Sequence, residues 1–211
     1  MEQYLMTHSL LSSWLWCIKD NPYEVADDDS DDSSEKRLSA YDEFLLTLRR
    51  EPTPTNEAMQ KGIDFEDLVT AITEGRGDYK SKWYEAADEV AGIVKGAILQ
   101  FRGSKPAEVR GVPLILYGRF DALKAGVIYD IKFSGSYEVG KYIDSTQHPM
   151  YLEIVPEATE FTYLVSNGSN VWPETYTREE TPSIIPTITA FFDWLDVYGL
   201  MGLYKEKWLS Q

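Results

Sequence analysis

The spacing of apolar residues along the chain first changes after about residue 101. Up to that point apolar residues recur every three or four positions, which is typical of helices with one buried face. The helices expected from this pattern span residues 8–18, 38–50, 56–73 and 79–101. The first half of the chain is therefore expected to be helical.

Alternation of apolar and polar residues then predicts strands at 108–111, 113–123 and 126–134, with turns at 111–113 and 124–125. A helix is expected at 137–154, a strand at 160–165, a hairpin turn at Asn167 and Gly168, a strand at 171–177, and a last helix to about Trp208. Because a helical crossover favours a parallel return strand, this order predicts an α/β fold with a mixed sheet flanked by helices.

The composition is compatible with one domain. At 211 residues and 43% hydrophobic content, the chain can bury one sizeable core. We expect a helical extension at 1–55, a core at 56–166, and a final hairpin strand and helix at 167–211. No apolar run approaches a membrane span, no secretory signal pattern is present, and Cys17 is the only cysteine. These features predict a cytoplasmic protein without a membrane partner or an internal disulfide.

The formal net charge is −15, which is unusual for a protein that handles nucleic acid. Much of this charge lies in an acidic stretch at 20–35, which is expected to be a solvated loop. The remainder of the chain is still acidic. Any contact with DNA would therefore need a local basic strip, and salt should weaken it.

Asp130 and Lys132 are the most informative pair in the expected strand at 126–134. Side chains in a strand alternate between faces, so these two point the same way while Ile131 points oppositely. An unpaired charge on an otherwise apolar strand costs free energy. A divalent cation bound by Asp121 and Asp130 would offset that cost, with Lys132 beside it to orient a water or hold a phosphate oxygen. This pattern outlines a hydrolytic phosphodiester site.

Two expected helices carry further candidates. Glu66 shares a helix face with apolar residues, where a carboxylate is unusual unless something pairs with it; alternatively, it is exposed beside neighbouring acids. Gln147 and Tyr151 are four residues apart and so share a helix face. There an amide and a phenol could hydrogen-bond phosphates or bases, although ordinary polar helix residues are the alternative interpretation.

Taken together, these residues resemble the PD-(D/E)xK nuclease superfamily, and within it the RecB-like branch. That branch carries Gly-x-x-x-(His or Glu), Gly-x-x-Asp, (Asp or Glu)-x-Lys and Gln-x-x-x-Tyr in this order. The matching positions here are Gly62 to Glu66, Gly118 to Asp121, Asp130 to Lys132 and Gln147 to Tyr151. The resemblance covers about residues 56–166 and implies a restriction-endonuclease-like α-βββ-α-β core.

The resemblance also implies an activity, that of a metal-dependent deoxyribonuclease. It favours an exonuclease of recombination or repair, similar to stand-alone phage enzymes. The implied ligands of Mg²⁺ or Mn²⁺ are Glu66, Asp121, Asp130 and the carbonyl of Ile131. Such hard oxygen ligands suit these cations. Lys132 would position the attacking water, and Gln147 and Tyr151 would contact the substrate.

The resemblance bears on partners and on other cofactors too. It implies DNA as the partner, with a single-strand annealing protein as a further candidate and a homo-oligomer as an open alternative. Residues 9–17 resemble the start of RecB-like nucleases whose cysteine ligates an iron–sulfur cluster. Because the sequence contains no cysteine besides Cys17, no iron–sulfur cluster is expected.

Two other functions are considered alongside cleavage of DNA. Residues 135–141 match most of a phosphate-binding P-loop, but Tyr142 stands where a Ser or Thr should hold Mg²⁺. The second alternative is a non-catalytic DNA- or protein-binding module that kept the nuclease fold. The acidic charge favours that module, whereas the intact set of acids and lysine disfavours it.

The nuclease interpretation makes a geometric prediction. A two-residue turn at 124–125 pairs Leu123 with Gly126 and makes Asp130 the diagonal neighbour of Asp121 on one face. A turn of three residues would place the two acids on opposite faces unless a bulge intervened. We therefore expect an even turn or a bulge, with Glu66, Asp121 and Asp130 converging near Lys132.

Overall fold

The computed structural model describes residues 2–19, 39–52 and 55–210 and has an α/β fold, as the sequence predicts. The helices are α1 (His8–Lys19), α2 (Ala40–Arg49), α3 (Glu57–Thr73), α4 (Tyr84–Val94), α5 (Gln147–Ile154), α6 (Ile185–Val197) and α7 (Met201–Lys207). The strands are β1 (Tyr4–Met6), β2 (Ile98–Val109), β3 (Val112–Lys124), β4 (Val127–Phe133), β5 (Glu160–Ser166) and β6 (Val171–Thr177). The acidic stretch at 20–35 lies outside the described residues.

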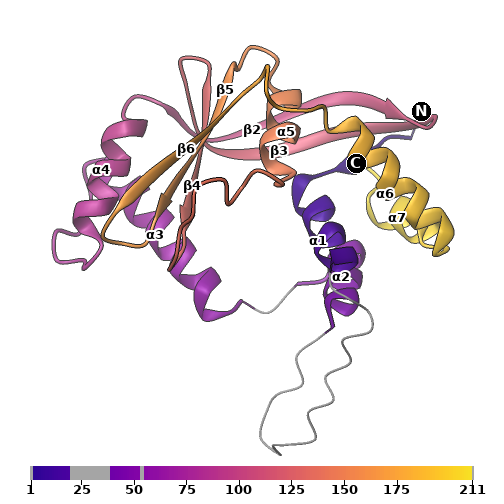
Figure 1. Ribbon diagram of the computed structural model, residues 1–211, viewed down its shortest axis with the longest axis horizontal. Helices are drawn as coiled ribbons and strands as arrows, with labels where there is room; N and C mark the ends of the chain where they lie inside the picture. Colours follow the sequence, from indigo (N-terminus) through magenta and orange to yellow (C-terminus); the bar gives the residue numbers. More distant parts are fainter. Residues whose placement is uncertain (1, 20–38, 53–54, 211) are drawn as a thin grey trace, which may run out of the picture. The chain divides into compact units, whose positions relative to one another are not determined.

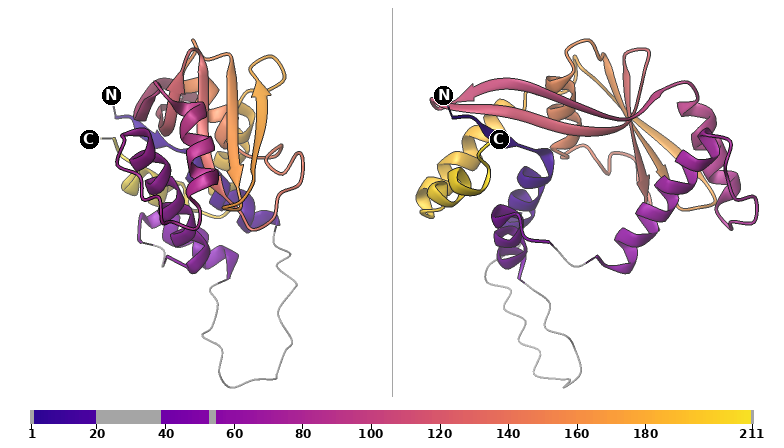
Figure 2. Two further views of the ribbon diagram at one scale, coloured as in Figure 1. Left: turned by 90° about the vertical axis from the view of Figure 1, so that its left-hand side faces the viewer. Right: turned by 180° about the vertical axis from the view of Figure 1, so that it is seen from behind.

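The chain forms two compact units. Unit 1 comprises residues 1–54, 106–115 and 185–211, and unit 2 comprises residues 55–105 and 116–184. Strands β2 and β3 have residues in both units and form one long hairpin (Figure 2). All residues of the expected site belong to unit 2.

The sheet is mixed, with the order β1-β3-β4-β5-β6 and with β2 paired to β3. Strand β4 pairs with β3 in the antiparallel sense and with β5 in the parallel sense, and α5 lies between β4 and β5 in the chain. The parallel return strand expected after a helical crossover is therefore confirmed. Strand β6 completes an antiparallel pair with β5.

In unit 2, helices cover both faces of the sheet (Figure 1). Helices α3 and α4 pack on one face around Phe65, Val69 and Val90, in a cluster that also includes Ala122 of β3. Helix α5 packs on the other face, where the Tyr151 ring meets Phe120 with centroids 4.4 Å apart. Each strand of unit 2 therefore has one face toward α3 and α4 and the other toward α5, and a candidate site must lie on one of these two faces.

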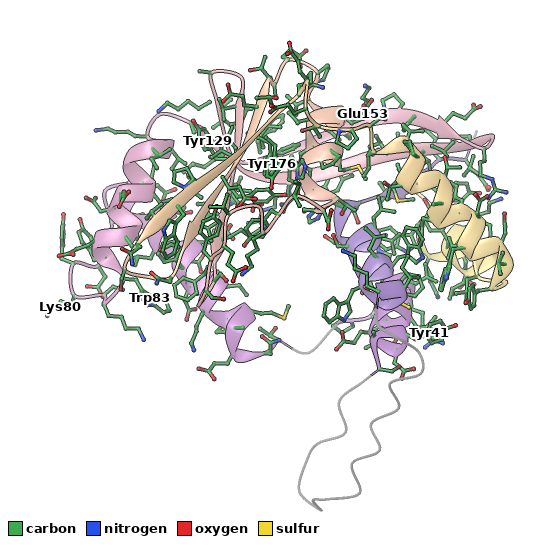
Figure 3. The ribbon with its side chains drawn as sticks, viewed as in Figure 1. Tyr41, Lys80, Trp83, Tyr129, Glu153 and Tyr176 are labelled. Atoms are coloured by element: carbon green, nitrogen blue, oxygen red, sulfur yellow. The ribbon has the colours of Figure 1, made fainter. Side chains whose placement is uncertain are left out.

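The half-buried ring of Trp83 packs against the core of unit 2 (Figure 3). It packs against Phe65 and Phe133 with centroid distances of 6.3 and 4.8 Å. Gly168, in the turn between β5 and β6, has a φ of +89°, and a Cβ there would collide with the Trp83 ring. Glycine is thus required in this turn both for its backbone conformation and for the space that the ring occupies.

Two tight turns fix the register of the central hairpins. Arg110 and Gly111 have φ values of 52° and 72°, and Ala125 and Gly126 have φ values of 50° and 82°. Two consecutive residues with positive φ are the signature of a type I′ turn. The expected turns at 111–113 and 124–125 were therefore misplaced, because the glycine takes the second position of each turn.

Two expected helices are shorter than the sequence pattern indicates. The helix expected at 79–101 ends at Val94, and the chain continues as β2 from Ile98. Gly96, with a φ of +79°, terminates the helix, although Ala97 and Phe101 continue its apolar spacing by coincidence. The helix expected at 137–154 begins only at Gln147, and residues 134–146 form turns.

Unit 1 is built around an aromatic cluster. Trp14 of α1 lies 5.3 Å from Phe191 of α6, and Phe44 of α2 lies 5.3 Å from Trp194, each measured between ring centroids. The indole N–H of Trp208 donates to the carbonyl of Leu48 at 2.8 Å. The last helix expected from the sequence is two helices, α6 and α7, separated at a glycine with positive φ. Among the described residues, no helix is both long and apolar enough to cross a membrane.

Candidate active site

The β3–β4 hairpin brings Asp121 and Asp130 together. The ladder runs from Lys124 paired with Val127 to Ala122 paired with Tyr129, so the regular pairing ends one residue before Asp121 on β3 and one residue before Asp130 on β4. At that point the Asp121 carboxylate accepts a hydrogen bond from the backbone N–H of Ile131 at 2.7 Å. The turn has the even length that we expected, but it is shifted by one residue, to Ala125 and Gly126.

The alternation of faces along β3 breaks at Asp121. Phe120 packs against α5, whereas Ala122, two residues later, packs in the cluster of α3 and α4. Residues two apart in a regular strand share a face, so one residue must be inserted here in the manner of a β-bulge. The insertion explains how the Asp121 side chain can turn toward the backbone of β4.

Asp130 and Lys132 lie on the face that α5 covers. Asp130 is only 3% exposed, and its Oδ1 accepts a hydrogen bond from the side-chain amide of Gln147, the first residue of α5. The Lys132 ammonium lies 2.8 Å from Oδ2 of Asp130. Gln147 and Lys132 thus contact different oxygens of the Asp130 carboxylate. Because each carboxylate oxygen can accept more than one contact, Asp130 keeps acceptor capacity for a further cation.

Tyr151 supports the strand that carries Asp121. It is 3% exposed, and its hydroxyl donates to the backbone carbonyl of Arg119 at 2.9 Å. A Cβ at Gly118 would lie 2.6 Å from Cε1 of the Tyr151 ring, so only glycine leaves room for this packing. Gln147 and Tyr151 are both buried and contact site residues directly; their expected contact with substrate stays a prediction.

Glu66 lies on α3 and is held by two residues that the sequence analysis missed. Its Oε1 accepts a hydrogen bond from the amide nitrogen of Gln100 on β2 at 2.8 Å, and Nη2 of Arg119 lies 3.7 Å away. The Nε–H of Arg119 in turn donates to the amide oxygen of Gln100. Gln100 has a φ of 51°, which is uncommon for a residue with a side chain. Its unusual backbone is part of the arrangement that holds Glu66.

The charged side chains of the site shift one another's pKa values. Burial is the main cause of a strongly raised pKa at Asp121, and the charges of Asp130 and Glu66 raise it further. Burial alone would lower the pKa of Lys132, but Asp130 and Asp121 outweigh it, so the pKa is raised above its ordinary value. Lys132 is therefore a cation at neutral pH, suited to offset negative charge rather than to accept a proton.

The carboxylates of the site suit a hard divalent cation, but the set of ligands is incomplete. Asp121 and Asp130 are adjacent, and a cation between them would relieve the repulsion that raises the pKa of Asp121. Within the part of the chain that the structure describes, however, no three acidic, histidine or cysteine side chains form a ready metal-binding group. The expected convergence of three acids is thus incomplete, and the Glu66 carboxylate accepts a hydrogen bond from the amide of Gln100 instead. Completion of the set requires Glu66 to rotate away from that amide.

The segment that resembles a P-loop has a different architecture. A P-loop lysine sits at the start of a helix, but here the next helix, α5, begins only at Gln147. The Lys141 ammonium donates to the Ser134 hydroxyl at 2.6 Å and to the Ser136 carbonyl at 2.9 Å. Glu174 anchors the same segment by accepting from the Tyr142 backbone N–H at 3.1 Å. Lys141 serves to close its own loop.

Comparisons with known proteins give the fold alone. No protein-family model matches the chain, and no curated protein matches it. A crystal structure of the protein SSO0001 is similar, with a TM-score of 0.52 and 13% sequence identity over 94% of this chain and 78% of that chain. This similarity supports the α/β assignment.

Proposed function

We propose that the protein is a metal-dependent deoxyribonuclease, and that it acts as an exonuclease in recombination or repair. The observation that carries the proposal is the pair of adjacent carboxylates, Asp121 and Asp130, beside the ammonium of Lys132. Buried charged groups of this kind are concentrated at active sites, because elsewhere they destabilise the fold and serve no catalytic purpose.

The proposal gives each residue of the site a role. Asp121 and Asp130 would hold Mg²⁺ or Mn²⁺, together with Glu66 after its rotation and the Ile131 carbonyl. The bound cation would supply Lewis-acid activation of the phosphate and of the attacking water. Lys132, kept charged by its acidic neighbours, would stabilise the negative charge that develops on the phosphate oxygens.

Gln147 and Tyr151 would hold this arrangement in place. Gln147 fixes the rotamer of Asp130 by donating to Oδ1, and Tyr151 fixes the path of β3 at Arg119, two residues before Asp121. A site whose ligands are oriented by buried hydrogen bonds needs little reorganisation during the reaction.

The test is incubation with end-labelled linear and circular DNA in Mg²⁺, Mn²⁺ or EDTA. We expect cleavage with either cation, preference for linear DNA, and no cleavage in EDTA. Asp130→Asn should abolish cleavage and remove the thermal stabilisation by Mn²⁺, since a cation bound only by the folded state raises its stability. Full activity of this variant, or activity in excess EDTA, would exclude the proposal.

A second pair of variants separates catalysis from binding. Lys132→Ala should keep binding of DNA and of Mn²⁺ but lose most turnover, whereas a binding module would show no turnover to lose. Lys141→Ala removes the same charge from the neighbouring loop and should remain substantially active. An inactive Lys141→Ala variant with a normal Lys132→Ala variant would instead favour nucleotide hydrolysis.

A further inference from the structure

The negative charge of the candidate site opposes the binding of its proposed substrate, DNA. A phosphate group approaching Asp121 and Asp130 meets like charge on a protein whose net charge is −15. Lys132 offsets this charge only in part, because Asp130 already occupies it at 2.8 Å. A further cation beside the acids is needed to receive the substrate.

Arg119 has the required position. It lies two residues before Asp121 on β3, and its side chain is 56% exposed. Its Nε–H donates to Gln100, and Nη2 lies 3.7 Å from Glu66. The other terminal nitrogen, Nη1, contacts no acceptor among the described residues. The guanidinium is thus tethered on one edge and open to solvent on the other.

The backbone of Arg119 is also fixed. Its carbonyl accepts the Tyr151 hydroxyl at 2.9 Å, and the Tyr151 ring occupies the space left by Gly118. An arginine whose backbone and Nε are both held loses little conformational freedom when it binds a phosphate oxygen. Arg119 is therefore better suited to a phosphate contact than a flexible surface arginine is.

Gln100 links this arginine to Glu66. Its amide oxygen faces Arg119 and its amide nitrogen faces Glu66, which is the one orientation that satisfies both partners. A phosphate bound at Nη1 leaves the bond from Nε to Gln100 in place, but it offsets the guanidinium charge that attracts Glu66 and repels the Glu66 carboxylate, so Glu66 can leave the amide of Gln100. Release of Glu66 is the rotation that the proposed cation site requires.

We propose that Arg119 binds a phosphate oxygen of the DNA substrate beside the acids, and that Gln100 is a positioning residue that couples this contact to Glu66. The inference rests on the proposed nuclease function and adds a substrate contact to it.

The first experiment measures DNA binding as a function of salt. The parent is Lys132→Ala, which is expected to bind without cleaving, and the probe is a fluorescent DNA duplex followed by anisotropy in Mg²⁺. Each phosphate contact contributes about 0.9 to the slope of log affinity against log salt. Adding Arg119→Gln should lower that slope by about 0.9, so between 50 and 200 mM salt the affinity should fall about 3.5-fold less than in the parent.

Arg102→Gln is the matched control. Arg102 is an exposed arginine on β2, but it lines a separate cavity with Phe101, Ile154 and Glu157. This control removes the same charge and should leave the slope unchanged. Equal slopes for the parent and Arg119→Gln would overturn the inference alone, whereas a parent that does not bind DNA would overturn the nuclease proposal as well.

The second experiment tests the coupling through Gln100. Gln100→Glu keeps an acceptor for Arg119 but places a second carboxylate against Glu66, so it should displace Glu66 and change the Mn²⁺ concentration that gives half-maximal cleavage. A merely structural defect would lower the maximal rate at every Mn²⁺ concentration without shifting that midpoint. An unchanged midpoint would therefore refute the coupling.

Discussion

Gly118→Ala is expected to destabilise the protein, although it adds only one methyl group. The new Cβ would lie 2.6 Å from Cε1 and 3.0 Å from Cδ1 of Tyr151, and 3.3 Å from Cδ1 of Ile154. The Tyr151 ring cannot easily retreat, because Phe120 packs against it and its hydroxyl is bonded to the Arg119 carbonyl. The clash must therefore displace either the ring or β3.

The magnitude follows from two opposing terms. Overpacking of a well-filled core costs about 1–3 kcal/mol, and loss of the buried tyrosine hydrogen bond costs about 1 kcal/mol more. Replacement of glycine reduces the entropy of the unfolded chain, which returns about 0.4–1 kcal/mol. We expect a net loss of about 1–3.6 kcal/mol, which corresponds to a decrease in Tm of about 2–4 °C for each kcal/mol in a chain of this size.

Urea unfolding followed by tryptophan fluorescence measures this loss directly. Gly135→Ala is the control, because a Cβ there meets no atom within 4 Å, and it should change stability by less than about 0.5 kcal/mol. The double variant Gly118→Ala with Tyr151→Leu should lose less than the sum of the single variants, since the clash partner is gone. A Gly118→Ala variant as stable as the parent protein would show that Tyr151 does not fill this space.

Three further predictions concern other parts of unit 2. Burial lowers the pKa of His148 to about 4, below its ordinary value of about 6.5, so the folded state binds a proton less readily than the unfolded state. The free energy of unfolding should therefore fall by about 2 kcal/mol as the pH is lowered from 7 to 5. His148→Gln should remove that part of the pH dependence, as measured by urea unfolding. Arg178 donates to the carbonyls of Leu152, Val155 and Ala158 at 2.7 Å each, so Arg178→Met should cost about 2–4 kcal/mol in the same assay. Ala125 has a positive φ at the first position of its turn, and Ala125→Asn should raise Tm by relieving about 1 kcal/mol of strain, with no change in Tm counting against the turn assignment.

The sequence predicts what depends on local periodicity. Strand alternation correctly places Asp130 and Lys132 on one face, and the parallel return of β5 follows from the helix that precedes it. The helix expected at 79–101 was too long because a few apolar residues fit both the helical and the strand period, and only Gly96 indicates where the helix must stop.

The partners of Glu66 could not be predicted in the same way. Gln100 reaches Glu66 across 34 positions of the sequence, and nothing in its neighbourhood distinguishes it from other polar residues. Arg119 offered a weak signal, as a charged residue between Gly118 and Asp121. Contacts of this kind depend on the register of β2 and β3 and on the packing of α3, which no local pattern specifies.

The two-residue turn at Ala125 and Gly126 has a consequence for how this protein can diverge. Because the turn fixes the pairing of β3 with β4, the number of residues between Asp121 and Asp130 is set by geometry rather than by the identity of the residues between them. An insertion of one residue in this turn would send one acid to the opposite face of the sheet, whereas an exchange of almost any apolar residue along the hairpin would leave both acids in place. Chains with this hairpin can therefore keep the spacing while their sequences drift apart, and searches for relatives should weigh that spacing above residue identity.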